Sequence, residues 1–138
     1  CGKGQILAVG ADLGTSYREA QQSQLRDFIR AALVRLYVPR VALRSATGLA
    51  EINALVKDGR LLVQLVNGNG RHTAMNALTD DVLPPLLDLE LDIRTPQRPK
   101  AVRIQPEGHS LPYDWQDGVT SVKIPRVDIH AVIEVEEP

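Results

Sequence analysis

The sequence has 138 residues, of which 43% are hydrophobic and 24% charged, an ordinary composition for a globular domain with a buried core. The formal net charge of −1 argues against a nucleic-acid surface, which needs a basic patch, and no apolar run is long enough to cross a membrane. Cys1 is the single cysteine, so an intrachain disulfide is excluded and a cysteine-based metal site is disfavoured. We therefore expect no nucleic-acid partner, no membrane partner and no cofactor; the compartment stays open, with the cytoplasm favoured.

The first elements predicted are a short strand and a helix. Gln5 to Val9 (Q-I-L-A-V) form an apolar run that precedes a glycine-containing loop, and this strand–loop–helix order is typical of a parallel α/β sheet. A parallel strand needs parallel neighbours, and no second unit of this kind follows. Since the chain also begins at Cys1 rather than Met, we expect residues 1–39 to be the closing strand and helix of an upstream α/β domain in a longer protein.

The helix is predicted from its cap and its apolar face. Ser16 and Glu19 have the spacing of a capping box, and Pro39 ends the helix. The loop of residues 10–16 lacks both the spacing and the lysine of a Walker loop, so we interpret it as a plain strand–helix turn. Burying the large side chains of the apolar face is worth about 10 kcal/mol, so this face must dock on something. We call this face the helix stripe; its members are Leu25, Phe28, Ile29, Ala32, Leu33 and Leu36.

Residues 40–138 carry the pattern of an antiparallel β domain. Asp58-Gly59 and Asp117-Gly118 are strong hairpin signals, and apolar and polar residues alternate along the run from Leu87 to Arg94. We predict a mainly β fold, an antiparallel β-sandwich of about eight strands. The strands are expected at residues 41–44, 51–56, 61–66, 87–94, 102–104, 113–116, 119–124 and 127–135.

The stretch from Asn67 to Pro85 interrupts the regular spacing of the strands. It opens with Asn67-Gly68-Asn69-Gly70, and connections of this length are usually functional or mobile. A sheet-to-sheet crossover with a flexible tip is the favoured interpretation.

No catalytic constellation is predicted. The three histidines, His72, His109 and His130, lack metal-ligand spacing, and His130 is expected to be a solvated residue of the last strand. Asp88, Glu90 and Asp92 share one strand face, which is the usual pattern of a strand's solvent side. We therefore assign neither catalytic nor metal-binding residues.

Tyr113 and Trp115 are the strongest candidates for ligand binding. They stand two positions apart on a predicted strand, so both should project from one face. Such a pair can form a stacking surface for a sugar ring, or it can supply bulk to a sandwich core or a domain interface. With Asn67 and Asn69 of the polar stretch, they make up the candidate carbohydrate-binding residues.

Several segments resemble the C-terminal region of bacterial multidomain glycoside hydrolases. G-K-G before the first strand and Q-L-R-D-F in the helix resemble the end of their glutamine-amidotransferase-like domain, also called the β-galactosidase trimerisation-type domain. The segments R-L-L-V-Q-L-V-N, P-K-A-V-R-I-Q-P-E-G and V-K-I-P-R-V-D-I-H-A-V-I-E-V resemble the small β-sandwich that follows it. They occupy residues 2–4, 24–28, 60–67, 99–108 and 122–135.

The resemblance implies a parent enzyme with an upstream (β/α) barrel that acts on β-galactoside, α-fucoside or related bonds. The catalytic carboxylates would belong to that barrel, so none carries over to this chain. The main hypothesis is a non-catalytic accessory domain that supports domain packing or oligomer assembly, with the upstream domains of the same polypeptide as partners. The alternatives are a carbohydrate-binding module that uses Tyr113 and Trp115, and a homo-oligomerisation module that uses the helix stripe; a free-standing enzyme ranks last.

Overall fold

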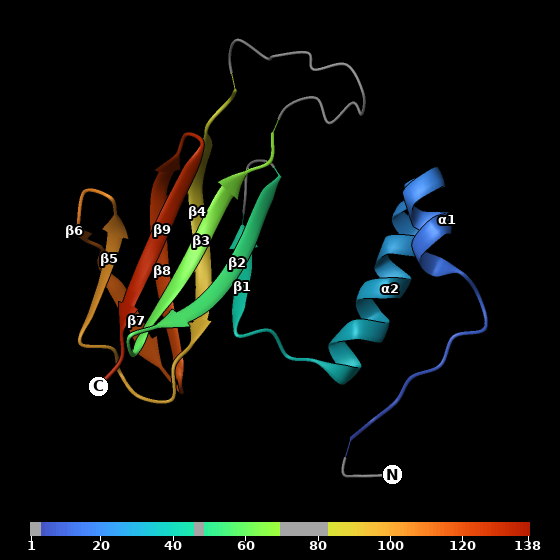
Figure 1. The fold of residues 1–138 in the computed structure, drawn as a ribbon, viewed down its shortest axis with the longest axis horizontal. Coiled ribbons are helices and arrows are strands. Elements are labelled where there is room, and N and C mark those ends of the chain that lie inside the picture. Colours follow the sequence, from blue (N-terminus) through green and yellow to red (C-terminus); the bar gives the residue numbers. More distant parts are fainter. Residues whose placement is uncertain (1–3, 46–48, 70–82) are drawn as a thin grey trace. The chain divides into compact units, whose positions relative to one another are not determined.

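The computed structural model describes residues 4–45, 49–69 and 83–138. The chain divides into two compact units, Cys1–Pro39 and Arg40–Pro138 (Figure 1). Within these described ranges, the first unit holds two helices and the second holds nine strands.

The first unit contains two helices where the sequence predicted one. Helix α1 spans Leu13–Ala20 and helix α2 spans Ser23–Leu36, and Gln21 separates them with a φ of 47°. The predicted capping box is wrong, because Ser16 lies inside α1. Asp12 is the cap instead: its Oδ1 accepts a hydrogen bond from the Thr15 amide at 3.0 Å, so the helix already begins before Ser16.

The predicted strand at Gln5 to Val9 is also wrong. Residues 4–9 form no strand, and Ile6 is 90% exposed. A strand requires hydrogen bonds to a neighbouring strand, and the described residues offer none to this segment. Neither helix buries a residue, and Phe28 and Leu33 of the helix stripe are exposed. The assignment of residues 1–39 to an α/β domain remains a prediction.

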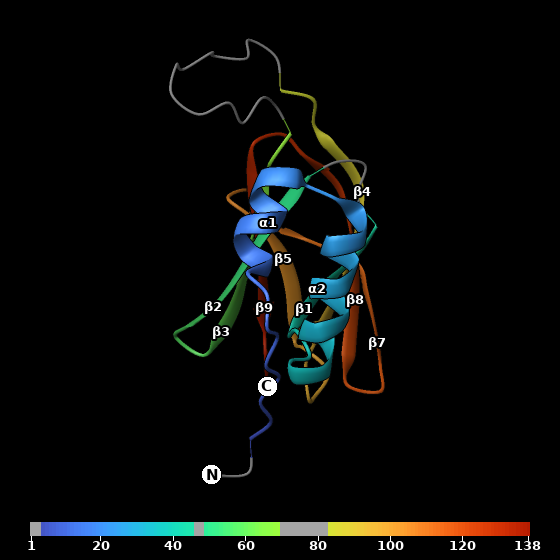
Figure 2. The ribbon, with the colours of Figure 1, turned by 90° about the vertical axis from the view of Figure 1, so that its right-hand side faces the viewer.

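The second unit is a β-sandwich of two antiparallel sheets, which confirms the predicted fold class. The four-stranded sheet has the order β1-β4-β8-β7, and the five-stranded sheet has the order β2-β3-β9-β5-β6 (Figures 1 and 2). The strands are β1 (Val41–Ser45), β2 (Ala50–Lys57), β3 (Arg60–Asn67), β4 (Leu86–Arg94), β5 (Ala101–Gln105), β6 (His109–Ser110), β7 (Tyr113–Gln116), β8 (Val119–Val127) and β9 (His130–Glu136).

The core lies between the two sheets and is built by alternation along the strands. In β3, for example, Leu61, Val63 and Leu65 are buried, while the residues between them face the other side of the sheet. The other fully or nearly fully buried apolar residues come from both sheets: Leu86, Leu89, Leu91, Ile93, Val102, Val122, Ile124, Val127, Ala131, Ile133 and Val135.

Two strand predictions need correction. In β4 the buried residue is Leu86 rather than Leu87, because Asp88 has a φ of 50° that interrupts the regular alternation. The predicted strand from Val127 to Val135 is in fact the end of β8 and all of β9, with a bend at Asp128 and Ile129 between them. The polar–apolar alternation continues through this bend, so the sequence pattern conceals it.

No helix in the described ranges is long and apolar enough to span a membrane.

Candidate functional site

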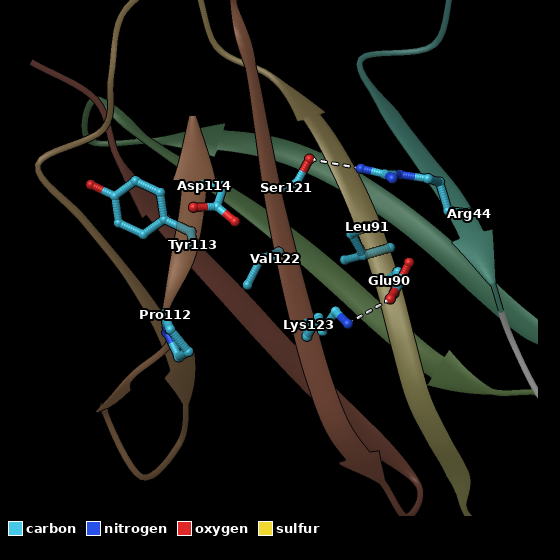
Figure 3. Close-up of a pocket in the computed structure, with 9 residues that line it drawn as sticks. All are labelled: Arg44, Glu90, Leu91, Pro112, Tyr113, Asp114, Ser121, Val122 and Lys123. Atoms are coloured by element: carbon cyan, nitrogen blue, oxygen red, sulfur yellow. Dashed lines mark hydrogen bonds and ion pairs between the residues drawn. The ribbon is translucent and has the colours of Figure 1, made fainter. Parts of the chain in front are cut away.

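A hollow of about 430 Å³ lies on the outer face of the four-stranded sheet, and we call it the sheet hollow (Figure 3). The inward side chains of these strands form the core, so their neighbours along each strand must point outward into this hollow. The polar residues that line it come from all four strands of the sheet: Arg44, Glu90, Asp114, Ser121 and Lys123.

Arg44 is held in the sheet hollow by the adjacent Asp92. The Arg44 Nη2 donates to Asp92 Oδ1 at 2.7 Å and to Ser121 Oγ at 2.9 Å, while its Nε lies 2.7 Å from Asp92 Oδ2. Ser121 Oγ also donates to Asp92 Oδ1 at 2.7 Å. The hydrogen bond from Arg44, helped by the one from Ser121, lowers the pKa of Asp92. The same pairing raises the pKa of Arg44, so both groups stay charged around neutral pH.

The other side of the sheet hollow contains one ion pair and one open carboxylate. Lys123 Nζ lies 3.0 Å from Glu90 Oε1 across the β4–β8 pairing (Figure 3). Asp114 stands opposite Ser121 in the β7–β8 pairing. Within the described ranges, the Asp114 carboxylate makes no hydrogen bond or ion pair, so its oxygens remain available to a ligand that donates hydrogen bonds.

The chemistry of the sheet hollow suits polar binding. Arg44 and Lys123 supply donors and Asp114 supplies acceptors, the combination that a polyhydroxylated ligand uses. The lining residues include no histidine or cysteine that could act as base or nucleophile. In the part of the chain that the structure describes, no three His, Cys, Asp or Glu residues gather as metal ligands.

Tyr113 and Trp115 lie on the same face of β7, as predicted from their spacing. They pair with Val122 and Thr120, two buried residues of β8, so this face is directed towards the core. The Tyr113 hydroxyl donates to the Pro99 carbonyl at 2.7 Å, and the Trp115 Nε1 donates to the Thr95 carbonyl at 3.2 Å. The polar tips of both rings are therefore engaged within the domain, and Tyr113 borders the sheet hollow.

Asn67 and Asn69 form a separate cluster at the end of β3. The Asn67 Nδ2 donates to the carbonyls of Pro84 (2.8 Å) and Asp128 (2.7 Å), and its Oδ1 accepts from the Asn69 amide. The Asn69 Oδ1 accepts from the Leu49 amide at 3.0 Å. Together these contacts join the chain segments that precede and follow residues 70–82. Those residues, which include most of the predicted crossover, lie outside the described part of the chain.

The structure does not bring the four predicted ligand-binding residues together. Trp115 is paired with Thr120 near the start of β8, whereas Asn67 contacts Asp128 just beyond its end. Val127 lies seven positions after Thr120, which is roughly 23 Å along an extended strand. The aromatic pair, Tyr113 and Trp115, and the asparagine pair, Asn67 and Asn69, therefore lie at opposite ends of the sandwich.

The residues that line the sheet hollow were not predicted as a site. The alternation of β4 did predict that Glu90 and Asp92 face outward, and they do. The pairing of β1 with β4 brings Arg44 to Asp92 across 48 residues of sequence, and no local signal reveals such a pairing.

The histidines stay apart from the sheet hollow. His109 in β6 and His130 at the start of β9 are both exposed, the latter as predicted. His72 lies outside the described residues.

In a second polar cluster, on the outer face of the five-stranded sheet, the charged groups pair with one another. The buried Glu134 accepts from Arg60 at 2.8 Å and from the Gln105 amide at 2.9 Å, and Arg103 lies 3.5 Å away. Arg103 also donates to Glu136 at 3.0 Å. Because these groups satisfy one another, we interpret the cluster as structural.

Comparison with known proteins found no matching family model and no curated protein with a matching sequence. Among solved structures, the chain is similar to an alpha-L-fucosidase isoenzyme 2 from Paenibacillus thiaminolyticus, with a TM-score of 0.69 and 18% sequence identity. The likeness covers 91% of this chain and 20% of that protein, so the chain spans about a fifth of its structural neighbour. At 18% identity the likeness shows only that this chain shares a fold with part of the fucosidase, which is a glycoside hydrolase.

Proposed function

We propose that this chain is a non-catalytic accessory β-sandwich domain of a glycoside hydrolase, which supports the packing or assembly of the enzyme's other domains. The observation that carries the proposal is the likeness of almost the whole chain to one fifth of an alpha-L-fucosidase. A segment that makes up one fifth of an enzyme can be an accessory domain, with the catalytic residues in the other four fifths of the enzyme.

The electrostatics of the sheet hollow support a non-catalytic role. A glycosidase needs a pair of carboxyl groups, one of them with a raised pKa so that it can act as the acid. In the hollow Glu90 is paired with Lys123, and beside the hollow the pKa of Asp92 is lowered by Arg44. Asp92 therefore stays ionised and cannot donate a proton to a leaving group at neutral pH.

The proposal is tested by incubating the full chain with aryl α-fucosides and aryl β-galactosides. We expect no release of the aryl group above the background rate. The variants Asp114→Asn and Glu90→Gln serve as controls for a contaminating enzyme, since contaminating activity would be the same in all three preparations. Turnover that one of these substitutions abolishes would overturn the proposal.

A carbohydrate-binding role is the second candidate, favoured by the open acceptors of Asp114 beside Tyr113 in the sheet hollow. Calorimetric titration with galactosides, fucosides and plant oligosaccharides tests it. Binding that is lost in Asp114→Ala or Trp115→Ala, but kept in Asn69→Ala, would place the sugar on the β7 side of the domain. A flat trace at millimolar sugar would remove this candidate.

A further inference from the structure

Strand β2 is a long, regular and open edge of the five-stranded sheet. It pairs with β3 alone in the described part of the chain, through eight consecutive residue pairs without a bulge (Figure 2). It contains no proline, and two large apolar residues on its two faces, Leu55 and Val56, are 38% and 61% exposed. An edge of this kind is a template for pairing with another strand.

The other sheet edges are poor templates. Strand β6 has two residues and β7 has four, while β1 has five and a register shift between Leu43 and Ser45. Short or irregular edge strands are a common protection against unwanted pairing. Only β2, among the four edges of the described sheets, lacks this protection.

The hairpin turn determines which backbone groups of β2 face the open edge. Asp58 and Gly59 both have positive φ, 51° and 75°, as in a type I′ turn, and Lys57 pairs with Arg60 across the turn. The hydrogen bond that closes the turn makes Lys57–Arg60 a hydrogen-bonded pair. Hydrogen-bonded and non-hydrogen-bonded pairs then alternate along the β2–β3 ladder. The backbone amides and carbonyls of Ile52, Ala54 and Val56 therefore point away from β3, towards the open edge.

We propose that β2 pairs antiparallel with β2 of a second copy of this chain, about a two-fold axis at Ala54. In this register Ala54 lies opposite Ala54 of the other copy, and Ile52 lies opposite Val56. The three residues whose backbone groups point towards the open edge therefore pair with one another across the interface. The pairing joins the two five-stranded sheets edge to edge. A two-fold interface repeats every contact, so each pair other than the central one occurs twice.

Charge complementarity selects this register. Glu51 and Lys57 lie on the same face of β2 because they are an even number of residues apart. Pairing about Ala54 places Glu51 opposite Lys57 of the second copy, twice per dimer. Moving the register by two residues in either direction places Glu51 opposite Leu55, or Lys57 opposite Asn53, and forms no ion pair. The proposal gives the accessory domain a partner, but it does not depend on the parent enzyme's chemistry.

The first test measures the mass of the full chain by light scattering over a range of concentrations. We expect a dimer that is weakened roughly tenfold or more by Glu51→Lys or by Lys57→Glu, since each change places two pairs of like charges face to face. The double variant E51K/K57E should restore the dimer, because it brings opposite charges together again. Rescue by the double variant distinguishes this register from general surface effects.

The second test is a crosslink at the two-fold axis, in a Cys1→Ser background that leaves no other cysteine. Directly opposed residues of a hydrogen-bonded pair have Cα atoms about 5.5 Å apart, within disulfide range. Ala54→Cys should therefore crosslink two chains under mild oxidation. Asn53→Cys is the matched control, since its counterpart is displaced by two residues along the pairing and should not crosslink.

A monomer at all concentrations would overturn the proposal and leave the accessory role untouched. A dimer that ignores the charge reversals, or that crosslinks equally at positions 53 and 54, would also overturn it, by placing the interface elsewhere. Glu51, Asn53, Ala54 and Lys57 are all exposed, and a circular dichroism spectrum of each variant verifies that it folds.

Discussion

Asn67 shows how one polar side chain can close the end of a sandwich. It is only 6% exposed, and its amide nitrogen donates to the backbone carbonyls of Pro84 and Asp128 at 2.8 and 2.7 Å. These carbonyls belong to the segment before β4 and to the bend between β8 and β9. The residue that the sequence suggested for sugar binding therefore holds three separate segments together.

The first prediction is that Asn67→Asp destabilises the domain by about 2–3 kcal/mol in urea unfolding. The substitution removes the donor and places a carboxylate against two carbonyl oxygens in a buried position. Asn69→Ala is the control: this residue is only half-buried, so the loss of its hydrogen bonds with Leu49 and Pro84 should cost less. Equal costs at the two positions would contradict the structural role of Asn67.

The second prediction concerns Asp92, whose pKa is lowered by hydrogen bonds from Arg44 and Ser121. A carboxyl with a folded-state pKa below its unfolded value stabilises the fold above the unfolded pKa, about 4, and loses that contribution as the pH falls through the folded pKa. Asp92→Asn should therefore cost about 1 kcal/mol near pH 7, and the difference from the wild type should shrink below about pH 4.

The comparison with Asp92→Asn removes the effects of Asp12, Asp128 and Glu136, whose pKa values are also lowered, because both proteins contain them. Asp114→Asn is the control, since this carboxylate has no partner within the described ranges. A wild-type advantage over Asp92→Asn that stayed constant from pH 7 to pH 3 would argue against the ion pair.

At the scale of elements, the interruption in β4 decides which leucine belongs to the core. Leu86 is fully buried and Leu87 is 41% exposed, although simple alternation with the rest of the strand predicts the reverse. The cause is the positive φ of Asp88. It reverses the alternation, so that Leu86 rather than Leu87 faces the core.

The third prediction is that Leu86→Ala costs about 2–5 kcal/mol of unfolding free energy and Leu87→Ala less than about 1 kcal/mol. The two substitutions remove the same atoms at adjacent positions, so each serves as the control for the other. A larger loss for Leu87→Ala would mean that β4 keeps its alternation through Asp88.

The elements that could be predicted from the sequence carry local signals. Asp58-Gly59 and Asp117-Gly118 were predicted as hairpin turns, and all four residues have positive φ. The errors have local causes too. An aspartate with positive φ inside a strand has no sequence marker, and the bend at Asp128 keeps the alternation of its flanking strands. The segment Gln5 to Val9 is apolar enough for a strand, but apolar character cannot supply a hydrogen-bonding neighbour.

At the scale of the whole molecule, the sandwich carries its own core. Among the residues that the structure describes, every buried apolar one lies between Leu61 and Val135, and the ion pairs of both outer sheet faces join residues of the same unit. The sheet hollow could not be predicted because it depends on strand order, which brings β1 beside β4 and β7 beside β8. The alternation of β4 predicted that Glu90 faces outward, and only the topology adds Arg44 and Asp114.

The most direct test of the accessory role is to sequence the gene upstream of the Cys1 codon. We expect an open reading frame of at least about 250 further codons, the size of a (β/α) barrel, with strand–helix repeats and the carboxylates of a glycosidase. A start codon immediately before Cys1 would contradict the account, because the chain would then be a free-standing protein and not a domain of a glycoside hydrolase.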